Sequence, residues 1–134
     1  MAKQYTLGKN ERLKSRKQIE QLFKSGQRFV SPPFRIFYSF QAGQQSPEIS
    51  PLQVGFGASS RNFKTAVDRN RIKRLAKEAY RLQKNILQDK LKEQKRKLNV
   101  FFIYNGKTLP SYPDVYNSIN MALTKLIDIN MKKV

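Results

Sequence analysis

Residues 66–93 constrain the fold most, because apolar and basic side chains recur there with the period of an α-helix. At about 100° per residue, one arc of such a helix is apolar and the opposite arc is basic. The apolar arc comprises Ile72, Leu75, Ala76, Ala79, Leu82 and Ile86, and the basic arc comprises Lys73, Arg74, Lys77, Arg81 and Lys84. The pattern predicts one helix, from about Ala66 to Glu93, that docks on a sheet and presents a row of cations to solvent.

Two shorter helices are predicted, one toward each end of the chain. Ser15 and Gln18 have the spacing of a capping box and Gly26 stands at a C-cap position, so a helix over 15–25 is expected, with an apolar face of Ile19, Leu22 and Phe23. Ser111 and Asp114 can cap the last helix, whose core stripe is Val115, Ile119, Ala122, Leu123 and Leu126. Residues 1–10 show no periodic pattern and are expected to form a mobile basic arm.

Three segments have the patterns of β-strands. Residues 34–40 alternate, with Phe34, Ile36, Tyr38 and Phe40 on one face and Arg35, Phe37 and Ser39 on the other, and residues 52–58 alternate in the same way. Residues 98–106 are nearly continuously apolar, as expected of a strand buried on both faces. Residues 28–31 can add an edge strand, and 41–51 form a polar connection. The order helix, strands, helix, strand, helix predicts a single α+β domain over 1–134.

Charge points to a polyanionic partner. Lys and Arg total 27 against 9 acidic residues, a net charge of +18, whereas a soluble domain of this size needs only about 2–8. Residues 64–97 hold 13 of the 27 basic residues and residues 36–60 hold none. Nucleic acid fits this field best. An anionic membrane surface fits less well, because a membrane-binding helix would need large apolar residues where this helix needs its core.

The composition does not favour a self-sufficient active site. The chain has no His and no Cys, and its acidic residues are scattered, whereas a metal-dependent nuclease needs clustered carboxylates. No phosphate-binding loop motif and no apolar run of membrane-spanning length are present. The absence of Cys fits a reducing compartment, and we expect a cytoplasmic protein. No catalytic and no metal-binding residue is predicted.

Residues 54–81, VGFGASSRNFKTAVDRNRIKRLAKEAYR, resemble the signature region of the bacterial ribonuclease P protein component family. The family pattern is a strand ending in VGF, a basic loop and then AVxRNRxKRxxRE. The upstream segments LGKNERLKS, LFKSG and PPFRIF and the strand FFIYNG also fit. The resemblance therefore covers nearly the whole chain.

The resemblance implies a compact α/β sandwich with a left-handed βαβ crossover. It also implies a subunit of a ribonucleoprotein endonuclease, a hydrolase whose RNA cleaves the 5′ leader from precursor tRNA with Mg²⁺ bound mainly by that RNA. The expected partners are the catalytic RNA and precursor tRNA, with no membrane and no further protein required. The alternatives are a basic ribosomal or other structural RNA-binding protein without a role in cleavage and, less favoured, an autonomous nuclease.

The resemblance assigns two groups of residues. RNA-binding positions are Arg61, Lys64, Arg69, Asn70, Arg71, Lys73, Arg74, Lys77 and Arg81, and leader-binding positions are Ile19, Phe23, Arg35 and Phe37. Lys77 replaces a usual Arg, Asn62 replaces a second loop cation, and Lys64, Asp68 and Ile19 also depart from the family pattern. The alternation of residues 34–40 places Phe37 on the polar face and predicts that it is exposed. For Phe23, core packing and exposure are equally compatible with the sequence.

Overall fold

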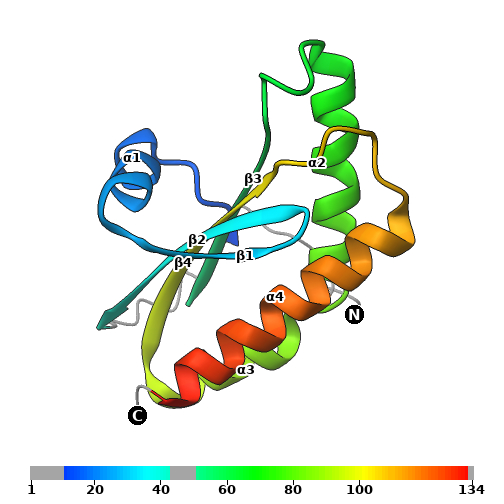
Figure 1. The fold of residues 1–134 in the computed structure, drawn as a ribbon. Helices are drawn as coiled ribbons and strands as arrows, with labels where there is room; N and C mark the ends of the chain where they lie inside the picture. The colour runs from blue at the N-terminus through cyan, green and yellow to red at the C-terminus, as the bar shows by residue number, and fades with distance from the viewer. Residues whose placement is uncertain (1–10, 43–50, 133–134) are drawn as a thin grey trace.

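The computed structural model describes residues 11–42 and 51–132. The predicted arm 1–10 and most of the connection 41–51 lie outside the described residues. Helices cover both faces of a central sheet, with α1 on one side and α2, α3 and α4 on the other (Figure 1). Within the described ranges, no helix is long and apolar enough to cross a membrane.

The sheet has the strand order β1-β2-β4-β3. Its strands are β1 Gln27–Ser31, β2 Phe34–Ala42, β3 Leu52–Ala58 and β4 Arg96–Tyr104. β2 pairs antiparallel with both β1 and β4, whereas β3 and β4 are parallel and are joined through α2 and α3. The βαβ unit implied by the resemblance is thus present, and its left-handed sense stays an expectation. The predicted edge strand is confirmed as β1.

The helices are α1 Arg16–Ser25, α2 Ala66–Arg81, α3 Asn85–Gln94 and α4 Tyr112–Lys132. Ser15 caps α1, because its hydroxyl accepts a hydrogen bond from the Gln18 amide at 3.3 Å, and the Gly26 amide donates to the Leu22 carbonyl at the other end. Ser111 accepts from the Asp114 amide at 3.4 Å at the start of α4. The predicted caps of both helices are confirmed.

The main core lies between the sheet and the layer of α2, α3 and α4. All five predicted core residues of α4 are buried there, as are Phe34, Ile36 and Tyr38 of β2 and Leu52 and Val54 of β3. A second, smaller cluster lies under α1 and contains Leu13, Leu22 and Phe37. β4 contributes alternate side chains to each cluster, Phe102 to the main core and Phe101 to the edge of the second. The prediction of a strand covered on both faces is therefore confirmed.

The prediction of one helix from Ala66 to Glu93 is wrong, because the chain turns after Arg81 and α3 begins at Asn85. The Gln83 side chain stabilises the turn by donating to the carbonyls of Ala79, at 3.1 Å, and Tyr116, at 3.2 Å. The helical phase is lost there, so Leu82 and Ile86 are 42% and 63% exposed rather than in the core. Lys84, predicted on the solvent side, is 1% exposed and forms an ion pair with Glu11.

Candidate RNA interface

The loop between β3 and α2 is held by hydrogen bonds at several points. Thr65 caps α2 by accepting from the Asp68 amide at 3.4 Å. The Arg69 guanidinium donates to the Phe63 carbonyl at 2.7 Å, and the Phe63 ring is buried beside Tyr104. The Asn62 amide donates to two carbonyls of the turn after β4, those of Asn105 and Gly106, at 3.2 and 3.1 Å.

These hydrogen bonds give Asn62, which departs from the family pattern, a structural role. Its side-chain amide can donate to two carbonyls at once and so holds the turn after β4 in place. In the sequence Asn62 stands out only as the replacement of a cation, and no local pattern predicts this brace. Arg61 and Lys64 are exposed on either side of it. The loop therefore presents its two cations from a backbone that is tied to the rest of the fold.

Helix α2 carries the basic residues on the side opposite its buried stripe. That stripe is Ile72, Ala76, Ala79 and Tyr80. We call the other side the basic ridge, which consists of Arg69, Arg71, Lys73, Arg74, Lys77 and Arg81. Arg71, Arg74 and Lys77 are exposed, and the other three are half-buried. Asn70 is also exposed. The predicted solvent orientation of Lys73, Arg74, Lys77 and Arg81 is confirmed. Of the predicted basic arc, Lys84 alone is buried and does not belong to the basic ridge.

Two arginines of the basic ridge also contact the protein itself. Arg69 braces the loop, as described above. The Arg81 guanidinium donates to the Glu78 carboxylate, with a distance of 3.0 Å from Nε to Oε2. This hydrogen bond raises the pKa of Arg81 above its ordinary value and outweighs the opposing effect of desolvation. Arg71, Lys73, Arg74 and Lys77 therefore form the part of the ridge best placed to contact an external anion.

The opposite face of the sheet carries a second candidate surface beside α1. We call it the aromatic groove and define it by Ile19, Phe23, Arg35, Phe37 and Phe101. Phe23 contacts both other rings edge to face, with centroid distances of 4.9 Å to Phe37 and 5.1 Å to Phe101. Ile19 is half-buried beside them and Arg35 is exposed. The structure thus brings together Ile19, Phe23 and Phe37, and it places Arg35 two residues from Phe37 on the same face of β2.

The predicted exposure of Phe37 is wrong, because its side chain is only 6% exposed. Helix α1 packs over β2, and Leu22 and Phe23 cover the ring. Phe23, at 39% exposed, is the ring that faces solvent. Phe101 is not among the predicted site residues, although the alternation of side chains along β4 could have placed it on the face opposite Phe102.

Glycines on β3 allow Phe101 to lie close to the sheet. A Cβ atom added to Gly55 would lie 2.5 Å from two ring carbons of Phe101, and one added to Gly57 would lie 3.1 Å from the same ring. A side chain at Gly55 would therefore displace the ring. Gly55 is buried beneath this ring, so the two glycines let Phe101 lie directly against the backbone of β3.

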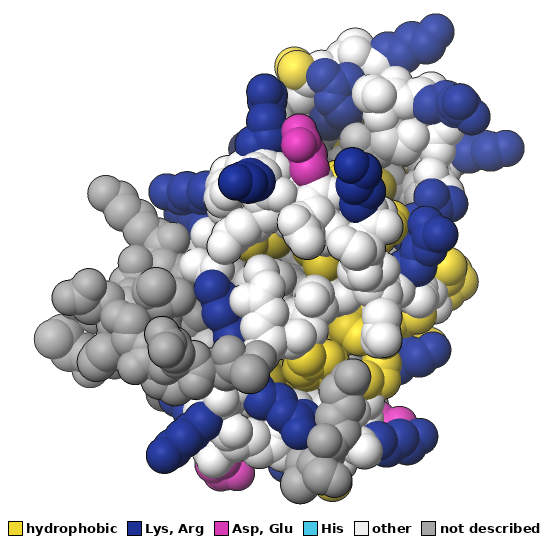
Figure 2. Space-filling view, turned by 90° about the vertical axis from the view of Figure 1, so that its left-hand side faces the viewer, with side chains coloured by type: hydrophobic (Ala, Val, Ile, Leu, Met, Phe, Trp, Pro, Cys, Tyr) yellow, Lys and Arg dark blue, Asp and Glu magenta, His cyan; other side chains and the backbone are white. Residues whose placement is uncertain are grey.

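Basic side chains surround this face of the molecule. Figure 2 looks from the α1 side and shows hydrophobic side chains at the surface with Lys and Arg side chains distributed around them. The described part of the chain contains no group of three or more His, Cys, Asp or Glu residues that could hold a metal ion. We assign the protein no step that involves a metal ion.

The fold and these two surfaces are those of a small α+β RNA-binding protein. The family model described as Ribonuclease P matches residues 7–127. The ribonuclease P protein component of Porphyromonas gingivalis (strain ATCC 33277) is 33% identical over 122 residues, covering 91% of this chain and 87% of that protein. The corresponding protein of Borrelia hermsii is 30% identical over 123 residues, covering 92% and 97%.

Solved structures agree on the fold. The Staphylococcus aureus RNase P protein superposes with a TM-score of 0.60 at 19% identity, covering 87% of this chain and 94% of that one. This chain belongs to the ribonuclease P protein component family. Members of the family are the protein subunit of ribonuclease P, a tRNA-processing endoribonuclease. The reading as a ribosomal or other structural RNA-binding protein is not favoured.

Proposed function

We propose that this protein binds the catalytic RNA of ribonuclease P through the basic ridge and the 5′ leader of precursor tRNA through the aromatic groove. The observation that carries the proposal is the arrangement of α2, which buries its apolar stripe in the core and leaves Arg71, Arg74 and Lys77 exposed. A rigid row of cations on one helix suits a folded RNA, whose closely spaced phosphates attract such a row.

The aromatic groove suits a single strand of variable sequence. Every base has a face that can stack on an aromatic ring, so stacking tolerates any leader sequence. Phe23 offers an exposed ring, and the exposed Arg35 offers a cation for the backbone on the same face of the sheet. Phe37 and Phe101 hold Phe23 in place from beneath.

The division of labour follows from the side chains present. Mg²⁺-dependent hydrolysis is assigned to the RNA subunit, which would hold the metal and so supply the charge stabilisation and activated water that such chemistry needs. The protein supplies cations and a stacking surface that favour binding of precursor over mature tRNA. We place this activity in the cytoplasm.

Reconstitution tests the proposal. The full chain is incubated with precursor tRNA and Mg²⁺, with and without a transcript of the catalytic RNA, and products are mapped at their 5′ ends. Cleavage at one position, dependent on the RNA and stimulated by the protein, is expected. Robust metal-dependent cleavage by RNA-free protein, or no stimulation by the protein at limiting Mg²⁺, would overturn the proposal.

A further inference from the structure

The α1 face of the sheet is divided into polar and aromatic rows. Ser39, Asn99 and Gln53 are register partners across β2, β4 and β3. The next row on the same face contains Phe37, Phe101 and Gly55. Helix α1 crosses over this boundary with Leu22 buried against the sheet. At about 100° per residue, Ile19 and Phe23 lean to the aromatic side of Leu22, and Gln18, Gln21 and Ser25 lean to the polar side.

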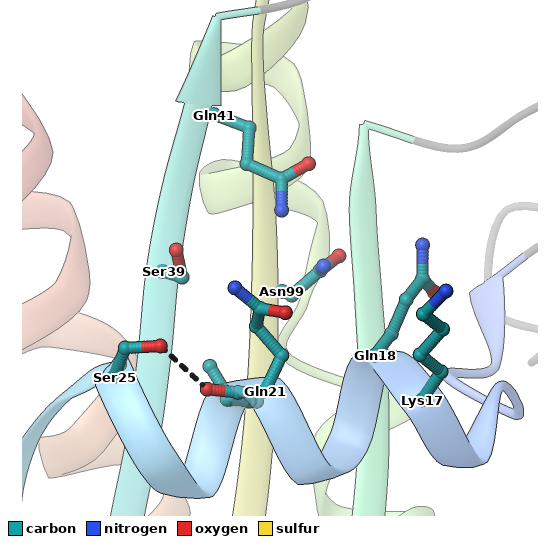
Figure 3. Close-up of a pocket in the computed structure, with 9 residues that line it drawn as sticks. Lys17, Gln18, Gln21, Ser25, Ser39, Gln41 and Asn99 are labelled. Carbon is teal, nitrogen blue, oxygen red and sulfur yellow. Dashed lines mark hydrogen bonds between the residues drawn. The ribbon is translucent and has the colours of Figure 1, made fainter.

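A pocket of about 330 Å³ lies on the polar side. Figure 3 shows the polar side chains that line this pocket: Gln18 and Gln21 on α1, Ser39 and Gln41 on β2, and Asn99 on β4. Its volume is near the lower end of the range for ligand pockets, about 300–1,000 Å³. Leu22 and Gly26 give it an apolar wall, and Lys17 lies among its lining residues.

Asn99 makes this pocket more than a surface hollow. Its side chain is 3% exposed, and its Oδ1 atom is buried without a hydrogen-bond partner among the described residues. A buried amide with an unfilled acceptor destabilises a fold unless something supplies the missing hydrogen bond. Rotation of the amide exchanges its donor and acceptor, so Asn99 can present either to a ligand.

We propose that this pocket, which we call the amide pocket, binds one unpaired RNA base. Its polar lining is mainly uncharged amides, which match the mixed donors and acceptors of a base edge. A phosphate would instead need cations inside the pocket, and Lys17 is the sole cation among the lining residues. The inference rests on the proposed function because that function brings RNA to this face. The base comes from the leader or from an unpaired nucleotide of the catalytic RNA.

The test uses holoenzyme assembled with the wild-type chain, Asn99→Leu, or the double variant Gln18→Ala/Gln21→Ala. Binding is measured for precursor tRNAs whose leaders are all A, all C or all U, for mature tRNA, and for the catalytic RNA with the protein alone. The wild-type enzyme is expected to rank the leaders by base, and the variants to lose about fivefold or more in affinity for the preferred leader.

The binding measurements with precursor tRNA and with the catalytic RNA distinguish the two sources of the base. A loss confined to precursor binding assigns the base to the leader, and a loss in binding of the catalytic RNA assigns it to that RNA. No change in either, with folded variants, overturns the inference and means that water alone fills the pocket. Asn117→Ala, an exposed amide on α4, is the matched control and should bind as wild type.

Two further comparisons keep the outcome interpretable. Because Asn99→Leu removes an unfilled acceptor, it should not lower the melting temperature, whereas a purely structural Asn99 would lower it. If that variant fails to fold, the exposed Gln18 and Gln21 provide the same test. Phe23→Ala reports on the aromatic groove alone. If it weakens precursor binding while the pocket variants do not, the proposed function stands and this inference fails.

Discussion

Phe23 is the residue through which the aromatic groove meets solvent. Its ring is 39% exposed and is held by edge-to-face contacts with Phe37 and Phe101. Those contacts fix the orientation of a ring that an incoming base can stack on, so little side-chain freedom is lost on binding. The more buried Phe37 supports this surface without forming its outer face.

We therefore expect Phe23→Ala to weaken holoenzyme binding to precursor tRNA by about 1–2 kcal/mol, since one stacking platform is lost. Binding of mature tRNA should be nearly unchanged, because it has no leader. Equilibrium binding with both tRNAs measures the difference. Phe37→Ala serves as the contrasting variant, with a loss of about 3 kcal/mol in unfolding free energy because it leaves a cavity under α1. Equal weakening for both tRNAs by folded Phe23→Ala would show that the ring does not contact the leader.

Tyr80 is a buried residue whose hydroxyl group affects how the stability of the fold depends on pH. Its ring packs against Phe56 and Phe102, with centroid distances of 5.6 and 6.2 Å, and its hydroxyl lacks a hydrogen-bond partner among the described residues. Burial raises the pKa of Tyr80 well above its ordinary value of 10.0, and the nearby Glu11 charge adds to the effect. The folded state therefore keeps a proton that the unfolded chain releases near pH 10. The resulting stabilisation is complete below pH 10 and is lost as the pH rises further.

Tyr80→Phe removes both the unpaired hydroxyl and this titration. At pH 7 the unfolding free energy should be unchanged or higher by up to about 1 kcal/mol. Above pH 10 the loss of stability should be less steep than in the wild type, although Tyr38 and Tyr104, whose pKa values burial also raises, keep part of it. Urea unfolding at pH 7 and at pH 10.5 measures both effects. A marked loss of stability at pH 7 would mean that the hydroxyl has a partner.

At the scale of elements, α2 separates stability from binding by face. Its buried stripe contacts the core, and its basic ridge extends into solvent. Arg69 belongs to both functions, because its guanidinium holds the Phe63 carbonyl. A test of RNA binding should therefore leave Arg69 intact and neutralise the cations that make no such brace.

We expect the triple variant Arg71→Gln, Lys73→Gln and Arg74→Gln to bind the catalytic RNA more weakly and with a flatter salt dependence. Each lost phosphate contact should reduce the slope of log affinity against log salt by roughly one unit. The melting temperature should hold, because none of these side chains belongs to the buried stripe. The control neutralises Lys90, Lys92 and Lys132 on α3 and α4, which removes the same charge elsewhere. Equal slopes for the two triple variants would show that net charge, and not the basic ridge, governs binding.

At the scale of the whole molecule, the start of the described chain connects layers that are distant in sequence. Arg12 forms a parallel bridge with Val54 on β3, and the Leu13 amide donates to the Val54 carbonyl at 2.9 Å. This segment covers part of the free edge of β3, which would otherwise present unpaired backbone groups. Glu11 then reaches Lys84 at the turn between α2 and α3. One ion pair thus ties the N-terminal segment to the helix layer.

Glu11→Gln should lower the unfolding free energy by about 3 kcal/mol, because it removes a carboxylate from a Lys84 side chain that is 2% exposed. The double variant Glu11→Leu/Lys84→Met should recover most of that loss, since no buried charge remains. Urea unfolding of the two variants provides the comparison. If Glu11→Gln is as stable as the wild type, the ion pair does not hold these layers together.

The sequence by itself determined the properties that depend on neighbours along the chain. Alternation in residues 34–40 and 52–58 assigned their strand faces, and the spacing of Ser15 and Gln18 placed the start of α1. The motif RNRIKR identified the family and the side of α2 that carries the cations. These features are local, because side-chain direction repeats with the helical or strand period.

Tertiary structure alone decided which of those faces are covered. Phe37 lies on the polar face of its strand, as its position predicts, but α1 folds back over it and removes it from solvent. Lys84 follows the basic period of α2, but the turn at Gln83 directs it inward to Glu11. The amide pocket likewise needs α1, β2 and β4 together. Periodicity records which side chains share a face, whereas burial depends on the distant segment that packs against that face.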